Sequence, residues 1–535
     1  MKFFQYIFFV LLILLAQPAL YSQYVPVHPS NQVYDLLTEL SNEHMLNIST
    51  YSTPLSRIEI GEFLDSLAQC EINKRQLKEI YFYLKDFGKD LNSFSNPGKR
   101  LDLLYYSDSQ FKITVNPILG GNYYRNVNGA AWHWWNGAEA WSYLGKWAFW
   151  GSLRDNHQSE YLTQPDYMNQ NSGGANFKKF TSGHVDFWEY RGGISYDFGI
   201  GHIALMKDHF SWGSNYHGSN ILSGRTPSFP HLNFKLKPVN WFEFSYIHAW
   251  LSSDVVDSTR SFFVTNAYGT DYREVYHSKF MAANLFTFKP LKRTDISFGN
   301  SIIYDYENPH IAYFIPVMFY KAVDHQLNSG INNMNSQLFF DLSVRELKNF
   351  HFYSTLFLDE LAVKRILDRD THNFYSLKTG IQVSNLLPNT YAGFEYTITN
   401  ALTFRHFVPT TTFESNRYNL GHYLEDNAKE FYFRLGFKPL RNMDVRLSYC
   451  KAIKSSDHTD LGTLPRMEIE SFTPIDWESN EAALEFNWQI INDVYFHSGY
   501  SLRTVSGKVE KLEIWTPEYY HGNTRTFKIG LNIGF

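Results

Sequence analysis

The 535-residue chain contains very little cysteine and, beyond its N-terminus, no long apolar segment. Cys70 and Cys450 fall in different predicted regions, and two isolated thiols make no disulfide framework. No run of about 18 apolar residues follows the first 23 residues, which excludes α-helical membrane spans from the rest of the chain. A net charge of −5 gives no reason to expect a nucleic-acid partner.

The sequence also lacks the short motifs of common catalytic sites. It has no His-Glu-x-x-His, no Walker loop, no Gly-x-Ser-x-Gly and no Cys-x-x-Cys. Asp359 and Glu360 are adjacent carboxylates, but neighbours on a strand face opposite ways and cannot flank one bond. We therefore expect no catalytic residue, no cofactor and no resident metal. An outer-membrane enzyme stays open as an alternative, because catalytic groups spread over a barrel leave little local signature.

The N-terminus has the pattern of a secretory signal peptide. Met1 and Lys2 form a short basic start, and an apolar run from Ile7 to Leu15 follows. This run is too short for a permanent membrane helix. We predict that residues 1–22 are a signal peptide, so that the mature protein is exported.

Aromatic residues are abundant, yet the chain is polar overall. Phe, Trp and Tyr make up 18% of the sequence, charged residues make up 19%, and the mean hydropathy is −0.34. Strands that alternate between lipid and water produce this combination, with aromatic girdles at the two membrane interfaces. A soluble β-sandwich or propeller is the alternative that shares the aromatic enrichment. The Trp-rich segment 132–150 is most simply explained as such a girdle, although a stacking platform for a ligand is the other interpretation.

The last residues, 527–535, alternate between apolar and polar or glycine positions and end on Phe535. An open strand at a chain end would pair with other chains, whereas a barrel closes by pairing its last strand with its first. The segment 431–438 alternates in the same way, with Arg434 and Lys438 on the second face. Such charges would each cost about 2–4 kcal/mol facing lipid, so that face must see water. We predict a mainly β fold, a transmembrane antiparallel β-barrel of about 16–18 strands over residues 98–535.

Connections between the predicted strands are of two kinds. Turns such as 290–293 and 439–442 are short and suit a periplasmic rim, whereas long polar stretches suit outward loops. The long stretches are 153–190, 251–276, 399–428, 453–478 and 504–524.

Residues 23–97 read as helical instead. Val33, Leu36, Leu37 and Leu40 form an apolar stripe at helical spacing. Ser56 with Glu59 forms a capping box, and a third helix is expected between Asn73 and Gly88. We predict a periplasmic α-helical bundle that ends at the turn around residue 97.

Four short stretches stand out as motifs. They are Pro54–Arg57, His209–Ser223 with the following Arg225, Pro227 and Pro230, Asn308–Pro316, and Leu356–Glu360. Together they resemble the Wzi-type family of capsule assembly proteins, over most of the mature chain. The resemblance implies an outer-membrane barrel with a periplasmic helical bundle, acting as a lectin that holds capsular or surface polysaccharide at the cell surface. A porin or glycan-uptake channel is the main alternative.

Sugars bind through apolar faces stacked on aromatic rings and through hydrogen bonds from planar polar groups. The motif over 209–231 carries both, and we expect it to be an outward loop. The candidate glycan-binding residues are Trp212, Asn215, Tyr216, His217, Asn220 and Arg225. The simpler interpretation is that these rings pack within the protein and these polar groups are solvated. Further expected partners are outer-membrane lipid and lipopolysaccharide, and the barrel assembly machinery during biogenesis.

Overall fold

The computed structural model describes residues 23–49, 51–91, 100–162, 179–181, 183–328, 334–360, 364, 373–456 and 471–534. The predicted signal peptide, the predicted domain border near residue 97 and the terminal Phe535 lie outside these ranges. Within them, no helix is long and apolar enough to cross a membrane.

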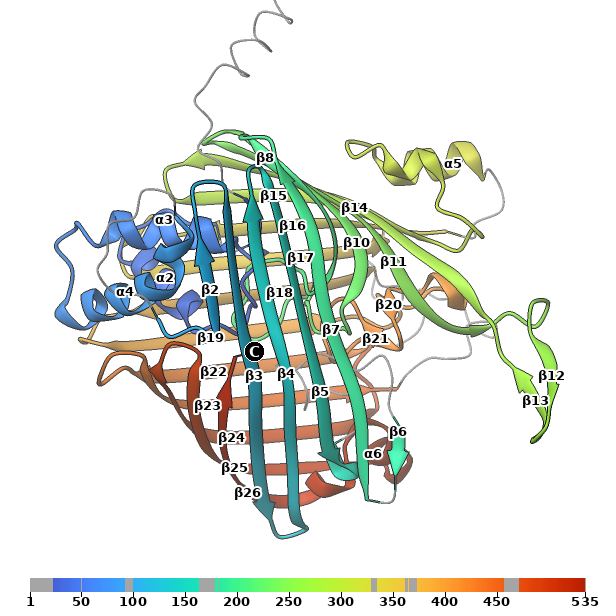
Figure 1. The fold of residues 1–535 in the computed structure, drawn as a ribbon. Coiled ribbons are helices and arrows are strands. Elements are labelled where there is room, and N and C mark those ends of the chain that lie inside the picture. The colour runs from blue at the N-terminus through green and yellow to red at the C-terminus, as the bar shows by residue number, and fades with distance from the viewer. Residues whose placement is uncertain are drawn as a thin grey trace, which may run out of the picture.

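Eighteen antiparallel strands close into one ring, in which each strand pairs with the next and β26 pairs with β3 (Figure 1). The ring is mainly a meander, as expected for a barrel whose last strand meets its first. Its strands are β3 (Phe111–Asn126), β4 (Gly129–Leu144), β5 (Trp147–Ser159), β7 (His184–Asp197), β8 (Gly201–Asp208), β10 (Phe229–Val239), β11 (Phe242–Val256), β14 (Tyr276–Leu291), β15 (Thr294–Tyr304), β16 (Asn335–Val344), β17 (Phe350–Glu360), β18 (Phe374–Ser384), β19 (Thr390–Thr399), β22 (Ala428–Phe437), β23 (Met443–Ser455), β24 (Ile475–Ile491), β25 (Val494–Gly507) and β26 (Gly522–Ile533).

An additional strand, β2, pairs with the first half of β3, next to the position where β26 ends. The strands outside the ring are all short, and apart from β2 they belong to connections or to the lumen. These elements are β1 (Ser52–Thr53), β2 (Leu104–Ser107), β6 (Lys179–Thr181), β9 (Ser211–Trp212), β12 (Phe262–Asn266), β13 (Gly269–Arg273), β20 (Glu414–Ser415) and β21 (Tyr418–Asn419).

The two ends of the ring differ in their connections. At one end the strands are joined by turns of two to five residues, including 292–293 and 438–442. At the other end lie the long connections, among them the β12–β13 hairpin and the helices α5 (Tyr320–Leu327) and α6 (Val509–Trp515) (Figure 1). The predicted division into a short-turn rim and a long-loop end is confirmed. The predicted long stretches are longer than the connections in the structure. For example, the stretch 153–190 includes the end of β5, which continues to Ser159, and the stretch 453–478 includes the start of β24 at Ile475.

The strand faces alternate as the sequence predicts. On β22, Phe431, Leu435 and Phe437 project from the outer surface, whereas Tyr432 and Arg434 are buried inside the ring. An apolar outer face and a polar inner face are what a barrel in lipid requires. The pattern arises because successive side chains on a strand point to opposite sides.

The tryptophans of β4 and β5 divide between these two faces. Trp132, Trp134 and Trp147 project outward, as a girdle requires. Trp135 and Trp141 are buried inside the ring. The girdle interpretation is therefore wrong for part of this cluster, since strand alternation sends every second side chain into the lumen.

Three helices precede the ring, and two of them are capped as the sequence predicts. They are α2 (Val33–Asn42), α3 (Arg57–Leu67) and α4 (Lys74–Phe87). Ser56 Oγ accepts a hydrogen bond from the Glu59 amide at the start of α3, and Gly88 caps the end of α4. The apolar stripe of α2 is fully buried in a cluster shared with α3 and α4.

These helices lie against the short-turn end of the ring, on the left in Figure 1. Asn42 Nδ2 donates to Ser384 Oγ at 3.0 Å, and Lys438 Nζ lies 2.7 Å from Glu39 Oε2. The Asn442 amide donates to Glu79 Oε1 at 2.9 Å. Each partner on the ring belongs to a short turn or to the strand end beside it.

The motif over 209–231 is predicted to be an outward loop, and this prediction is wrong. The connection between β8 and β10 folds into the lumen instead. Its strand β9 pairs with β1, which comes from the N-terminal segment, and Trp212 forms a second bridge with Leu222. Residues 209–228 contact lumen-facing side chains of β16, β17, β19 and β22 and a backbone carbonyl of β18, on the opposite wall of the ring. We call this stretch the inward segment. It turns inward because those walls offer buried hydrogen-bonding partners.

Candidate functional site

The inward segment is held by carboxylates that project from two strands into the lumen. Asp341 on β16 accepts hydrogen bonds from the amide and the hydroxyl of Ser214, at 2.8 and 3.0 Å. Glu395 on β19 accepts from the amides of Tyr216 and His217, at 2.5 and 3.1 Å. Hydrogen bonds to a charged acceptor are strong, and these satisfy backbone groups that would otherwise be buried without partners.

Lys378 on β18 compensates the charge of Glu395. Its Nζ lies 3.0 Å from Glu395 Oε2, and both side chains are almost completely buried. A buried carboxylate without a cation would be very costly, so this pair makes the anchor tolerable. The segment is thus fixed by directed polar contacts and not by apolar packing alone.

Three of the six candidate glycan-binding residues are structural. Trp212 is fully buried against Phe210 and Phe339, so its indole offers no free face to a sugar. Asn220 is fully buried, and its amide donates to the carbonyl oxygen of Ser376 at 2.8 Å. Asn215 accepts from the Gly218 amide at 3.0 Å and shapes the turn. These positions correct the expectation of an exposed motif, because the motif folds into the lumen.

The other three candidates, Tyr216, His217 and Arg225, line a chamber in the lumen. The imidazole of His217 stacks on Tyr432, with ring centroids 3.8 Å apart and planes 7° apart. The guanidinium of Arg434 lies 4.4 Å from the centroid of the Tyr216 ring. Arg225 lies beside Tyr423, 5.8 Å from its ring centroid. The structure brings these three candidates to one surface.

The chamber has a volume of about 590 Å³ and is bounded by the inward segment and by strands β3–β5 and β22–β26. Its lining combines aromatic rings with planar polar groups, many of which the sequence analysis does not single out. The rings include Tyr124, Trp135, Tyr216, Tyr423, Tyr432, Tyr495 and Tyr520, and the polar groups include Asn122, His133, Arg154, Arg225, Arg446, Glu481, Glu485, Asn487, His497, Arg503 and Lys528.

Neighbouring carboxylates fix two of the guanidinium groups of the chamber. Arg503 Nη2 lies 2.5 Å from Glu481 Oε2, and Arg446 Nη2 lies 3.0 Å from Asp444 Oδ2. A guanidinium has five donors, so a group held in this way keeps others for a ligand. The side chain of Glu485 is 45% exposed, which shows that the chamber is solvated.

The lining extends along most of the barrel axis. Asn532 and Gly534 lie at the short-turn end, whereas Pro517 and Tyr520 belong to the long connection after β25. The chamber therefore reaches from the vicinity of the helices to the vicinity of the long loops.

The wall residues cannot be identified from the sequence, because each is one polar position in an alternating strand. Arg446, Glu481, Glu485 and Arg503 are each a charged residue on a strand that lines the chamber. Alternation identifies the side of the sheet, but only strand pairing shows which of these residues face one another across the lumen.

The sequence matches no protein-family model and no curated protein. The fold is similar to that of Escherichia coli Wzi, described as an outer-membrane protein involved in group 1 capsule assembly and a carbohydrate-binding β-barrel. That likeness has a TM-score of 0.57 at 10% identity and covers 95% of this chain and 99% of that one. Acinetobacter baumannii OccAB2 and Pseudomonas aeruginosa OprD match at TM-scores of 0.43 and 0.39, with 7% and 8% identity. They cover 79% and 78% of this chain and 97% and 94% of their own. The closed ring and the likeness to Wzi show the fold of an outer-membrane β-barrel and support that location.

Proposed function

We propose that this protein is an outer-membrane lectin of the capsule assembly type, which binds surface polysaccharide in the lumen chamber. The single observation that carries the proposal is the lining of that chamber, where aromatic rings and oriented guanidinium and amide groups face one solvated space. These are the groups that stack on sugar rings and hydrogen-bond to sugar hydroxyls. Similarity to a carbohydrate-binding barrel agrees with the proposal.

Binding in the chamber differs from binding on an exposed loop. Tyr216, His217 and Arg225 contribute to the chamber from the inward segment, and Tyr124 and Arg503 contribute from the wall. A polymer that enters from the long-loop end could contact both surfaces. Repeating units raise the effective concentration of the next unit, so weak contacts at each sugar suffice for retention.

A glycan channel is the second candidate function. Its support is the axial extent of the chamber, whose lining includes residues near both ends of the ring. Against an open pore stands the inward segment, which crosses the lumen and is pinned to the far wall. Ion conductance across a planar bilayer separates the two functions, because a lectin closed by its inward segment conducts poorly.

The binding test uses Tyr124 and Tyr123, which are adjacent on β3 but face opposite sides of the sheet. Tyr124 lines the chamber, and Tyr123 is exposed on the outer surface. Loss of one stacked ring lowers the binding free energy by about 0.5–1.5 kcal/mol, in addition to the contribution of its buried area. This corresponds to roughly 2- to 13-fold in affinity. We expect Tyr124→Ala to weaken binding of polysaccharide extracted from the producing cells, and Tyr123→Ala to leave it unchanged.

The measurement is polysaccharide bound by purified, folded barrel, together with the fraction that cells retain or shed into the medium. Dextran serves as the control polymer. Equal binding by the wild type and a Tyr124→Ala, Arg503→Met double variant would remove the chamber from the binding function. A large conductance with no binding would favour the channel.

A further inference from the structure

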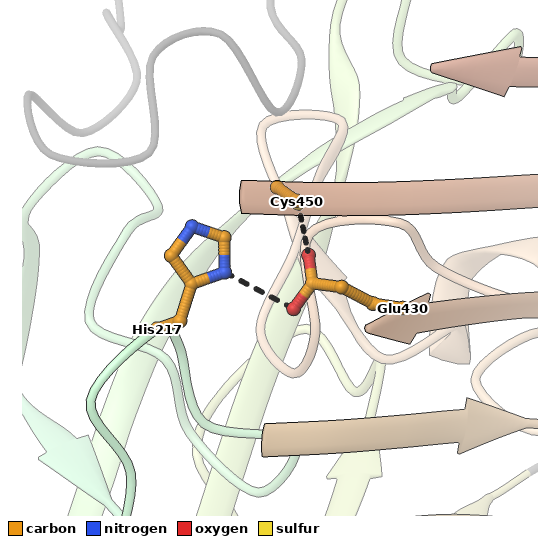
Figure 2. Close-up of side chains that lie close together, drawn as sticks. All are labelled: His217, Glu430 and Cys450. Atoms are coloured by element: carbon orange, nitrogen blue, oxygen red, sulfur yellow. Dashed lines mark hydrogen bonds and ion pairs between the residues drawn. The ribbon is translucent and has the colours of Figure 1, made fainter. Parts of the chain in front are cut away.

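A cluster of metal-ligating side chains lies where the inward segment meets the barrel wall. His217 comes from the inward segment, Glu430 from β22 and Cys450 from β23 (Figure 2). On these paired strands Tyr432 lies opposite Cys450, so Glu430 and Cys450 are diagonal neighbours on the lumen side. Cys450 is in no disulfide. Elements far apart in sequence thus bring a nitrogen, an oxygen and a sulfur ligand together.

The spacing of the three donor atoms suits one small cation. His217 Nδ1 lies 3.1 Å from Glu430 Oε1, and Cys450 Sγ lies 3.8 Å from Glu430 Oε2. All three ligand atoms lie within 4.8 Å of one another. Zinc bonds of about 2.0–2.3 Å at tetrahedral angles separate ligand atoms by roughly 3.3–3.8 Å. Small side-chain rotations are enough to seat the ion.

His422 provides a second, independent indication. Its side chain is 1% exposed, and Nε2 lies 3.4 Å from Glu430 Oε1. Its Nδ1 makes no hydrogen bond to any described residue, and the contact of Nε2 with Glu430 is long for a hydrogen bond. A buried imidazole with only one long contact is costly, and a metal beside Glu430 or its bound water would give Nε2 a shorter one.

We propose that His217, Glu430 and Cys450 bind Zn²⁺, with His422 beside the fourth coordination position. Imidazole, carboxylate and thiolate form a set typical of zinc, and thiolate disfavours magnesium and calcium. Binding releases the thiol proton to water, after which the two positive charges of the ion match one thiolate and one carboxylate. The site is then neutral, which lowers the cost of its burial.

The ion would link the inward segment to the wall beside the chamber. His217 and Cys450 both line the chamber, so an ion would enter the site from there. A zinc link would therefore fix the segment that crosses the lumen. This inference does not depend on polysaccharide binding, since the cluster is complete within the chain.

The test uses the full-length, detergent-extracted protein after chelator treatment and dialysis. We expect one zinc ion per chain by calorimetry, and with Co²⁺ a thiolate-to-cobalt charge-transfer band in the near ultraviolet. Cys450→Ser and His217→Ala should lose the band. Cys70→Ser is the matched control, because Cys70 is exposed on the helical region and should not affect it.

Heat-modifiable gel migration establishes that each variant is folded. In the wild type, zinc should also protect Cys450, but not Cys70, from alkylation, a measurement that requires no variant. A folded wild type that shows neither the cobalt band nor zinc protection of Cys450 would overturn the proposal. An undiminished band in Cys450→Ser would do the same.

Discussion

Trp212 shows how burial decides the role of a residue. Its sequence context suggests a stacking platform, yet its ring lies 4.9 Å from Phe210 and 6.3 Å from Phe339, between centroids, in the core of the lumen. Its backbone pairs with β1 and with Leu222. The residue therefore supports the inward segment, and any effect of its loss on a ligand is indirect.

We predict that Trp212→Ala destabilises the inward segment without unfolding the ring. Replacing a buried Trp by Ala lowers the free energy of unfolding by about 3–5 kcal/mol, since a cavity remains where the ring was. Local opening should therefore become more frequent, and hydrogen exchange of the amides in 209–228 should accelerate. The measurement is exchange by mass spectrometry on folded protein at one pH.

Trp212→Phe provides the graded control, because it keeps an aromatic ring and should accelerate exchange less. Unchanged exchange in Trp212→Ala would show that the carboxylate anchors alone hold the segment.

At the scale of an element, α2 is attached to the ring by charged groups. Burial raises the pKa of Glu39, but Lys438 and Arg75 outweigh it and lower the pKa to about 2. Glu43 and Glu79 lie close by, and burial raises the pKa of both. Glu43 and Glu79 therefore change the stability with pH in the direction opposite to Glu39. The contribution of Glu39 must be isolated by substitution.

We predict that Glu39→Gln weakens the attachment of α2 in a pH-dependent manner. Because the folded-state pKa is depressed, the stabilisation by Glu39 is fully present above its ordinary value of 4.5 and declines as the pH falls toward about 2. The wild type and Glu39→Gln should therefore differ most at neutral pH and converge in acid.

Resistance of the helical region to proteolysis, compared between the two proteins at each pH, measures this effect. Asp65→Asn, on α3, is a matched control that should show no such convergence. A difference that does not vary with pH would mean that Glu39 acts through shape and not through charge.

At the scale of the whole molecule, the two sides of the ring meet different solvents. Leu447 on β23 is exposed on the outer face, beside Leu435 and Leu484 on the paired strands. The adjacent Ser448 lines the chamber. Two consecutive positions thus report on the two environments.

We predict that Leu447→Arg destabilises the barrel more than Ser448→Arg does, although Ser448 lies opposite Arg434. An arginine facing lipid costs about 2–4 kcal/mol near the bilayer centre, whereas an arginine in the solvated lumen keeps its hydration. Urea unfolding in lipid vesicles, with heat-modifiable migration as the sign of a closed ring, measures the free energy of unfolding. Equal stability of the two variants would contradict a membrane-embedded outer face.

The sequence alone was sufficient to predict the barrel and its polarity. Alternation along 431–438 and 527–534, together with the short turns and long stretches, predicts the two faces and the two ends that the structure contains. These features are local, because a period of two and a turn composition can be read within about ten residues. The helices of residues 33–87 are predictable for the same reason, from their caps and apolar stripes.

Tertiary structure alone decided where the motif over 209–231 goes and which residues form the chamber. The direction of this segment depends on Asp341 and Glu395, which are more than one hundred residues away in sequence. The cluster of His217, Glu430 and Cys450 likewise joins three elements. Only closure of the ring brings such residues within hydrogen-bonding distance. The local sequence of this stretch is therefore compatible with an outward loop and with the inward segment. Only its hydrogen-bonding partners on the far wall distinguish the two.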